Sequence, residues 1–183
     1  MVGLESLITK LRSMNKVKVN HRIYCSMISK AFIVRRYPYL DERWVRDLFP
    51  NEAVTIHVFD RQKGGSMYQL RVMAIPVNHC PGSVMFRFET LNSSGDSVTR
   101  RILYTGDFRF EDQPLTSLVG LHSTTMLRPL DIDEMYLDTT FCHPKYLTFP
   151  KRDEALRSIW ELVHSWIRKN GMYRNQVRSN VIT

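Results

Sequence analysis

The stretch Ile102-Leu103-Tyr104-Thr105-Gly106-Asp107-Phe108-Arg109 joins an apolar strand pattern to a sharp turn and an acidic residue. Its first four residues are branched, aromatic or apolar, which is typical of a strand in a half-buried sheet. Gly106 allows the backbone to turn sharply directly after the strand. Asp107 is therefore mounted at a strand end, where a carboxylate could bridge metal ions. The alternative is a turn-capping role, because Gly-Asp pairs are common in loops.

Two other predicted strands end in the same way. Residues 75–83, Ile-Pro-Val-Asn-His-Cys-Pro-Gly-Ser, place His79 at a strand end, before a Pro-Gly turn that fixes the loop. Cys80 is expected to pack inward, because neighbouring strand residues face opposite ways. Residues 134–141 end a third strand in Asp138, for which helix capping is the alternative. Open sheets collect active sites at such edges, so the order His, Asp, Asp predicts a site there.

The remaining sequence predicts an α/β (α+β) fold with a β-rich sheet flanked by helices. The spacing of apolar residues predicts helices over 4–14, 27–36 and 151–169, and strands over 16–26, 54–59, 67–77, 83–90, 100–105 and 135–137. The polar stretch 41–51 is assigned no element, and 176–183 is typical of the start of a further strand. The apolar stripe of the helix over 151–169 is expected to pack against another part of the protein.

Charge and cysteine content narrow the classes of function. The 183 residues contain 26 Lys+Arg and 18 Asp+Glu, a formal net charge of +8, which favours an acidic partner. Nucleic acid is the first candidate, while an anionic membrane surface, an acidic protein or simple solubility also fits. Three widely spaced cysteines favour a reducing compartment over a disulfide framework. No stretch reaches the roughly 18 apolar residues of a membrane span, so a soluble intracellular protein is expected.

Three stretches together resemble the consecutive motifs of the metallo-β-lactamase-fold, β-CASP DNA-repair nucleases: 78–83, 104–109 and 137–142. The resemblance implies a partial metallo-β-lactamase fold and a nuclease that hydrolyses DNA phosphodiesters. It implies 5′–3′ exonuclease and hairpin or overhang endonuclease activity in non-homologous end joining and interstrand crosslink repair. It further implies a nuclear protein whose partners are DNA and the end-joining kinase and ligase factors, with no membrane association.

The resemblance also assigns roles to individual residues. His79 matches a zinc-ligand histidine, Asp107 matches the aspartate that bridges the metal site, and Asp138 matches the acidic residue at the junction to the β-CASP cassette. Asp107 and Asp138 are therefore the expected catalytic residues. The basic and hydroxyl side chains that are candidates for contact with DNA are Arg35, Arg36, Arg46, Arg109, Thr139 and Thr140.

One family motif is missing from the 183 residues. The His-x-His-x-Asp-His cluster is expected just before a Gly-Leu that resembles Gly3-Leu4, and it occurs nowhere in the sequence. We therefore expect residues 1–150 to be a partial metallo-β-lactamase domain and 151–183 to be a helix and strand at the β-CASP junction, truncated at both ends. Zinc should be held weakly, and the chain should be inactive alone. A non-catalytic DNA-binding or scaffold product, or a hydrolase acting on small molecules or RNA, remains an alternative.

Overall fold

The computed structural model describes Ser6 and residues 22–60, 65–109, 115–123, 125, 128–148 and 150–170. These divide into two compact units, residues 1–138 and residues 139–183. The predicted helix over 4–14, apart from Ser6, the first part of the predicted strand over 16–26, and the predicted strand over 176–183 lie outside the described residues. The division into domains at residue 150 stays a prediction.

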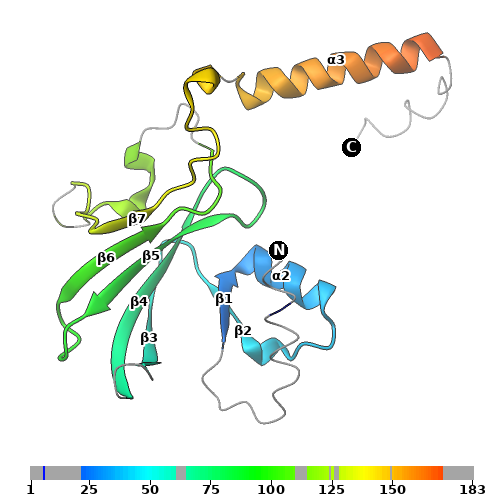
Figure 1. Cartoon of the computed structure of the whole chain (residues 1–183). Helices are drawn as coiled ribbons and strands as arrows, with labels where there is room; N and C mark the ends of the chain where they lie inside the picture. The colour runs from blue at the N-terminus through cyan, green and yellow to red at the C-terminus, as the bar shows by residue number, and fades with distance from the viewer. Residues whose placement is uncertain are drawn as a thin grey trace. The chain divides into compact units, whose positions relative to one another are not determined.

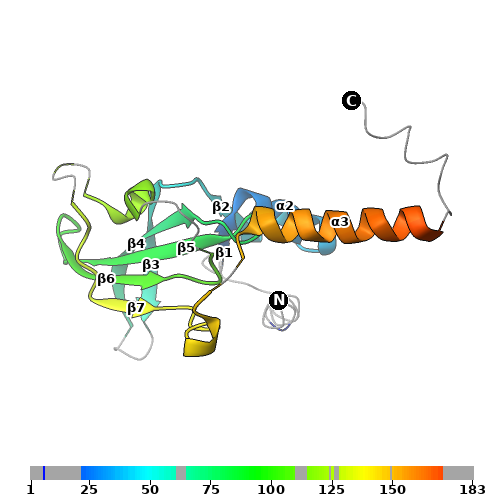
Figure 2. The same ribbon diagram turned by 90° about the horizontal axis from the view of Figure 1, so that it is seen from above.

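The first unit is built around a five-stranded sheet (Figure 1). Its strands are β3 Ala53–Asp60, β4 Ser66–Pro76, β5 Val84–Leu91, β6 Val98–Tyr104 and β7 Glu134–Tyr136. They lie in sequence order across the sheet (Figure 1), with β3 to β6 antiparallel and β7 parallel to β6, beside which it lies in Figure 2. The five predicted strands are confirmed to within two residues at each end. This mixed sheet, together with the helices, confirms the α/β class and is consistent with a partial metallo-β-lactamase fold.

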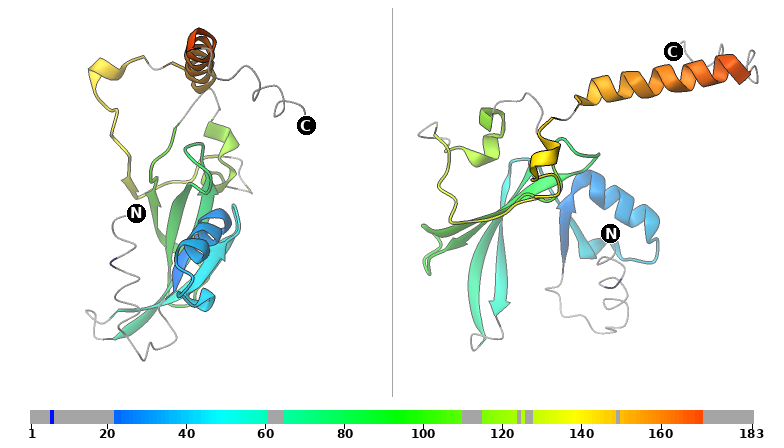
Figure 3. Two further views of the ribbon diagram at one scale, coloured as in Figure 1. Left: turned by 90° about the vertical axis from the view of Figure 1, so that its right-hand side faces the viewer. Right: turned by 45° about the horizontal axis from the view of Figure 1, so that its top comes forward.

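A smaller parallel sheet accompanies the large one in this unit. It pairs β1 Ile23–Ser26 with β2 Val45–Leu48, and the connection between them contains α2 Met27–Arg36 and the short 3-10 helix η1 Glu42–Trp44 (Figure 3). The predicted helix over 27–36 is confirmed, but leaving 41–51 without an element was wrong. Only Val45 and Leu48 of β2 are buried, and the charged pair between them hides the strand pattern in the sequence.

The large sheet has a core on each face. On one face Leu48 of β2 packs with Val72 and Ala74 of β4, and a bridge from Pro50 to Ala74 joins the two sheets. On the other face, the short 3-10 helix η2 Leu115–Ser117 leads into η3 Val119–Leu121, and Leu118 and Leu121 pack against the sheet. The side chains at the centre of this second core are Ile75, Met85, Leu103 and Leu118. The strand ends after β4, β6 and β7 therefore start from a well-packed sheet.

The second unit contains the 3-10 helix η4 Pro144–Tyr146 and the long helix α3 Arg152–Asn170. The predicted helix over 151–169 is confirmed. Its apolar stripe is largely exposed in the part of the chain that the structure describes, so the predicted packing is not seen there. Four side chains of the stripe are exposed and two are partly buried: Ile159, Leu162, Val163 and Trp166 are exposed, and Ala155 and Ile167 are partly buried. None of the described helices is both long enough and apolar enough to cross a membrane.

Candidate functional site

The turn after β4 presents His79. The His79 N–H donates to Val77 O (3.2 Å), and the Ser83 N–H donates to Cys80 O (3.0 Å), so the segment curls instead of continuing as a strand. Gly82 closes the turn with φ of +88°, a left-handed conformation that favours glycine. Cys80 is exposed, which corrects the expectation that it packs inward. The alternation rule fails here because the backbone is no longer extended.

The N-terminus of α2 holds this turn in place. Ser26 caps the helix by accepting from the Ser29 N–H (3.2 Å), and its hydroxyl donates to Gly82 O (2.7 Å). A Cβ added to Gly82 would lie 3.1 Å from Ser29 Oγ and 3.2 Å from Ile28 Cβ. The approach is close enough that the backbone position of the turn is fixed by the helix.

The turn after β6 brings Asp107 next to His79. Gly106 adopts φ of +55°, and the Arg109 N–H donates to Asn78 O (3.0 Å), which ties this turn to the one after β4. His79 Nε2 and Asp107 Oδ2 lie 3.8 Å apart. Their side chains are 44% and 78% exposed, so both remain accessible to a ligand.

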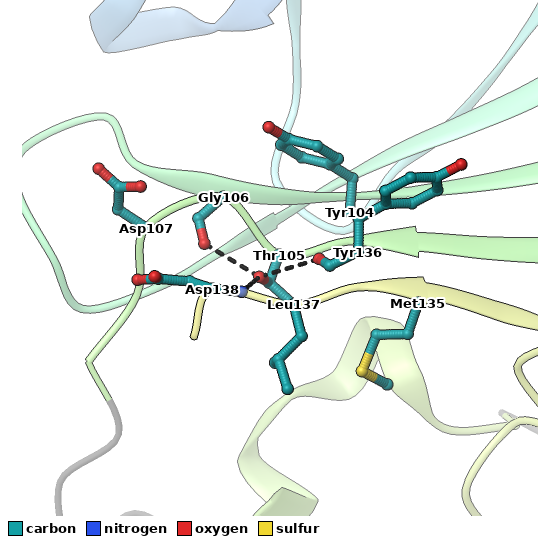
Figure 4. A pocket seen from close by; sticks show the side chains of 8 residues that line it. All are labelled: Tyr104, Thr105, Gly106, Asp107, Met135, Tyr136, Leu137 and Asp138. Carbon is teal, nitrogen blue, oxygen red and sulfur yellow. Dashed lines mark hydrogen bonds between the residues drawn. The ribbon is translucent and has the colours of Figure 1, made fainter. Parts of the chain in front are cut away.

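Asp138 is attached to the same edge through the buried Thr105. The Asp138 N–H donates to Thr105 Oγ1 (3.1 Å), and the Thr105 N–H donates to Tyr136 O (3.0 Å). The residues after β6 and β7 line an open pocket of about 480 Å³, formed by 104–107 and 135–138 (Figure 4). In Figure 4 the carboxyl groups of Asp107 and Asp138 both lie to the left of Thr105. The predicted gathering of strand ends is thus present in the structure.

Two tyrosines flank the carboxylates on neighbouring strands. The rings of Tyr104 and Tyr136 have centroids 6.0 Å apart, and both side chains are about half exposed. A hydrogen bond with Glu134 raises the pKa of the Tyr136 phenol above its usual range. The Tyr136 phenol is therefore a neutral hydrogen-bonding group at neutral pH.

The geometry of His79 and Asp107 can be compared with that of zinc ligands. Two ligand atoms at about 2.1 Å from one tetrahedral zinc ion lie about 3.4 Å apart. The observed 3.8 Å between Nε2 and Oδ2 differs from this by an amount that small side-chain rotations remove. The pair therefore fits two ligands of one ion. No group of three or more histidine, cysteine or acidic side chains among the described residues is arranged to hold a metal, so the pair alone does not make a complete metal site.

The residues predicted to contact DNA lie in several places. Arg35 and Arg36 are exposed in the last turn of α2, and Arg46 is exposed on the adjacent β2. Arg109 is half-buried beside the site, where its N–H joins the two turns. Thr139 and Thr140 are exposed at the start of the second unit.

Sequence reasoning missed two residues that position the site. A serine directly before a helix is a recognisable cap, so Ser26 could have been found from the sequence, but not its bond to Gly82. Thr105 stands in the motif, yet its partners on β7 come from more than 30 residues away. No local pattern predicts them.

Comparison with known proteins agrees with the motif resemblance. The chain is 36% identical to chicken protein artemis over 169 residues, which is 91% of this chain and 22% of that protein. It is 35% identical to the fission yeast DNA cross-link repair protein pso2/snm1 over 136 residues, 74% of this chain and 20% of that protein. The chain is a homologue of these metallo-β-lactamase/β-CASP DNA-repair nucleases.

A third relative is also similar over most of the chain. Mouse 5′ exonuclease Apollo is 34% identical over 154 residues, 82% of this chain and 25% of that protein. The chain thus spans about a quarter or less of the length of each of the three relatives. No family model matches the chain.

Proposed function

We propose that these residues belong to a DNA-repair nuclease of the Artemis type, with DNA as its substrate. The observation that carries the proposal is the distance of 3.8 Å between His79 Nε2 and Asp107 Oδ2 at one edge of the large sheet. Asp138 follows the adjacent strand and lines the same pocket as Asp107. Homology to DNA-repair nucleases over most of the chain supports reading this edge as part of a phosphodiesterase centre.

The finer assignment is part of the same proposal. We assign hydrolysis of DNA phosphodiesters, with 5′–3′ exonuclease and hairpin or overhang endonuclease activity, in the nucleus. The pathways are double-strand break repair by non-homologous end joining, with its kinase and ligase factors, and interstrand crosslink repair. The net charge of +8 supports a polyanionic substrate. Arg35 and Arg36 are exposed on α2, and Arg46 is exposed on β2. These three arginines are the proposed contacts with the DNA backbone.

The roles of the edge residues follow from their positions. His79 Nε2 and Asp107 Oδ2 are the atoms that would hold zinc, which when bound lowers the pKa of water and stabilises charge on phosphoryl oxygens. The Asp138 carboxylate is the group we assign to take up a proton in the pocket. Thr105 keeps Asp138 in place through the backbone bond of 3.1 Å. Ser26 keeps the His79 turn in place through its 2.7 Å bond to Gly82.

The chain taken alone should not cleave DNA. Zinc affinity depends on the number of preorganised ligands, and two side chains fill only two of the four coordination positions of a tetrahedral zinc ion. A non-catalytic DNA-binding or scaffold role is the second candidate, favoured by the net positive charge and by the absence of a His-x-His-x-Asp-His cluster from the 183 residues. The two candidates differ in whether His79 and Asp107 matter for repair.

Substitutions made in the gene that encodes the chain test the two candidates. We expect His79→Ala and Asp107→Ala cells to become sensitive to ionising radiation and to a crosslinking agent, whereas His57→Ala, at an exposed position on β3, leaves survival unchanged. Sensitivity to one agent alone selects the corresponding pathway. Normal survival of both edge variants, with sensitivity caused by replacing Arg35, Arg36 and Arg46 with glutamine, would reject the nuclease and support the scaffold.

A further inference from the structure

An ionic cluster lies in the middle of the large sheet, away from the strand-end turns. Arg71, Glu89 and Arg101 stand opposite one another on β4, β5 and β6. Arg71 Nε lies 3.1 Å from Glu89 Oε2, and Arg101 Nε donates to Glu89 Oε1 at 3.0 Å. The Glu89 side chain is only 5% exposed. A single carboxylate therefore faces guanidinium groups from both neighbouring strands.

A third guanidinium group belongs to the same cluster. Arg87 precedes Glu89 by two residues, so both side chains lie on the same face of β5. Its Nε lies 3.4 Å from Glu89 Oε1, its Nη1 donates to Gly120 O in η3, and its side chain is 9% exposed. Among the described residues, three guanidinium groups thus lie at ion-pair distance from the same carboxylate. The Asp133 Oδ2 accepts from the backbone N–H of Arg101 and forms no ion pair with these three groups in the part of the chain that the structure describes.

The cluster has donor capacity that the described residues do not use. The Nε atoms of Arg71 and Arg87 are buried and have no hydrogen-bond partner there, since their ion-pair distances to Glu89 lack hydrogen-bond geometry. Buried polar groups in native proteins are nearly always paired. Burial lowers the pKa of the Arg87 guanidinium, Glu89 partly opposes this, and the nearby Arg101 and Arg71 lower it further. The excess positive charge is therefore held at an energetic cost.

The cluster is partly open to solvent. The side chains of Arg71 and Arg101 are 35% and 28% exposed, whereas those of Arg87 and Glu89 are buried. Guanidinium groups offer several donors in a planar fork that matches the oxygens of phosphate. We propose that Arg71, Arg87 and Arg101, arranged around Glu89, form a binding site for a phosphate-class oxyanion. This site is separate from the proposed metal centre, and it does not depend on the proposed nuclease function.

The oxyanion could be a free phosphate or a phosphate group of a DNA strand, and the two sources share the same chemistry. Inorganic phosphate and a short single-stranded oligonucleotide without terminal phosphates are therefore the two probes. Each is titrated into the full chain while the thermal midpoint is recorded, with sodium chloride at matched ionic strength as reference. We expect at least one probe to raise the midpoint above the chloride reference. A response to phosphate identifies free anions as ligands, and a response to the oligonucleotide alone identifies DNA.

Three variants connect any response to the cluster. The double variant Arg71→Gln, Arg101→Gln should raise the dissociation constant of the probe by about tenfold or more, because each lost charged hydrogen bond corresponds to about that factor. Glu89→Gln should lower the dissociation constant by about tenfold, because the competing carboxylate is gone. Arg128→Gln, at an exposed arginine outside the cluster, should leave it unchanged.

If the double variant does not fold, the single variant Arg71→Gln, at the most exposed arginine of the cluster, takes its place. Glu89→Gln tests the proposal from the opposite side, because it removes the carboxylate and keeps all three guanidinium groups. A purely structural cluster predicts that Glu89→Gln destabilises the chain equally in chloride and in phosphate. The proposal predicts a larger response to the probe than in the unsubstituted chain. It is overturned if neither probe raises the midpoint above chloride, if the double variant responds as the unsubstituted chain does, or if Glu89→Gln binds the probe no more tightly.

Discussion

Charged side chains occupy two regions of the large sheet in opposite ways. At the edge, His79 and Asp107 are 44% and 78% exposed and are placed by backbone hydrogen bonds in their turns. In the centre, Glu89 and Arg87 are 5% and 9% exposed and are held by their own side-chain contacts. The edge residues are therefore available to a ligand without contributing much to folding. The central residues are part of the core, where each charge depends on the others.

The largest effect is expected in the central cluster. Replacing Glu89 by glutamine leaves three guanidinium groups without a carboxylate, and breaking a buried ion pair costs about 3–5 kcal/mol. Urea denaturation in chloride buffer measures the free energy of unfolding. Glu52→Gln, at an exposed carboxylate, is the control and should change it by less than about 0.5 kcal/mol. A Glu89→Gln loss as small as that of the control would place the cluster outside the core.

An intermediate effect is expected at the backbone support of the edge. Gly82→Ala puts a Cβ on a residue with φ of +88°, within 3.1 Å of Ser29 Oγ. We expect the unfolding free energy to fall by about 1–3 kcal/mol, since left-handed backbone strains a non-glycine residue. Gly95→Ala, also at positive φ but with only the Gln69 side chain nearby, separates backbone strain from the contact with α2. Equal losses at both glycines would show that the contact with α2 contributes nothing.

The smallest effect is expected from removing an edge charge. Asp107 is mostly exposed, so Asp107→Ala should change the free energy of unfolding by less than about 0.5 kcal/mol. The same urea denaturation measures it, with Glu52→Gln again as the reference. A loss comparable to that of Glu89→Gln would remove the distinction between the edge and the centre.

The two regions also differ in how far the sequence predicts them. The residues of the edge can be predicted from the sequence, because each is a single polar residue that follows an apolar strand pattern. In the structure His79, Asp107 and Asp138 do follow β4, β6 and β7. The contact between His79 and Asp107 depends on the bond from Arg109 to Asn78, which no local pattern contains.

The central cluster was not anticipated. Arg87 and Glu89 alternate along β5 like solvent-facing residues, and their burial follows from strand pairing and from η3. β2 was missed for a related reason, since its two buried residues flank Arg46 and Asp47. In both cases tertiary packing overrides a polar sequence pattern.

The central claim is that His79 and Asp107 form part of a single metal site. A zinc titration of the full chain, followed by NMR of the histidine side chains, tests it directly. We predict that the His79 signals shift at lower zinc concentration than those of His57, and that Asp107→Ala weakens this response by about tenfold or more. Zinc responses of His79 and His57 at the same concentration, or an Asp107→Ala chain that binds zinc as the unsubstituted chain does, would contradict it.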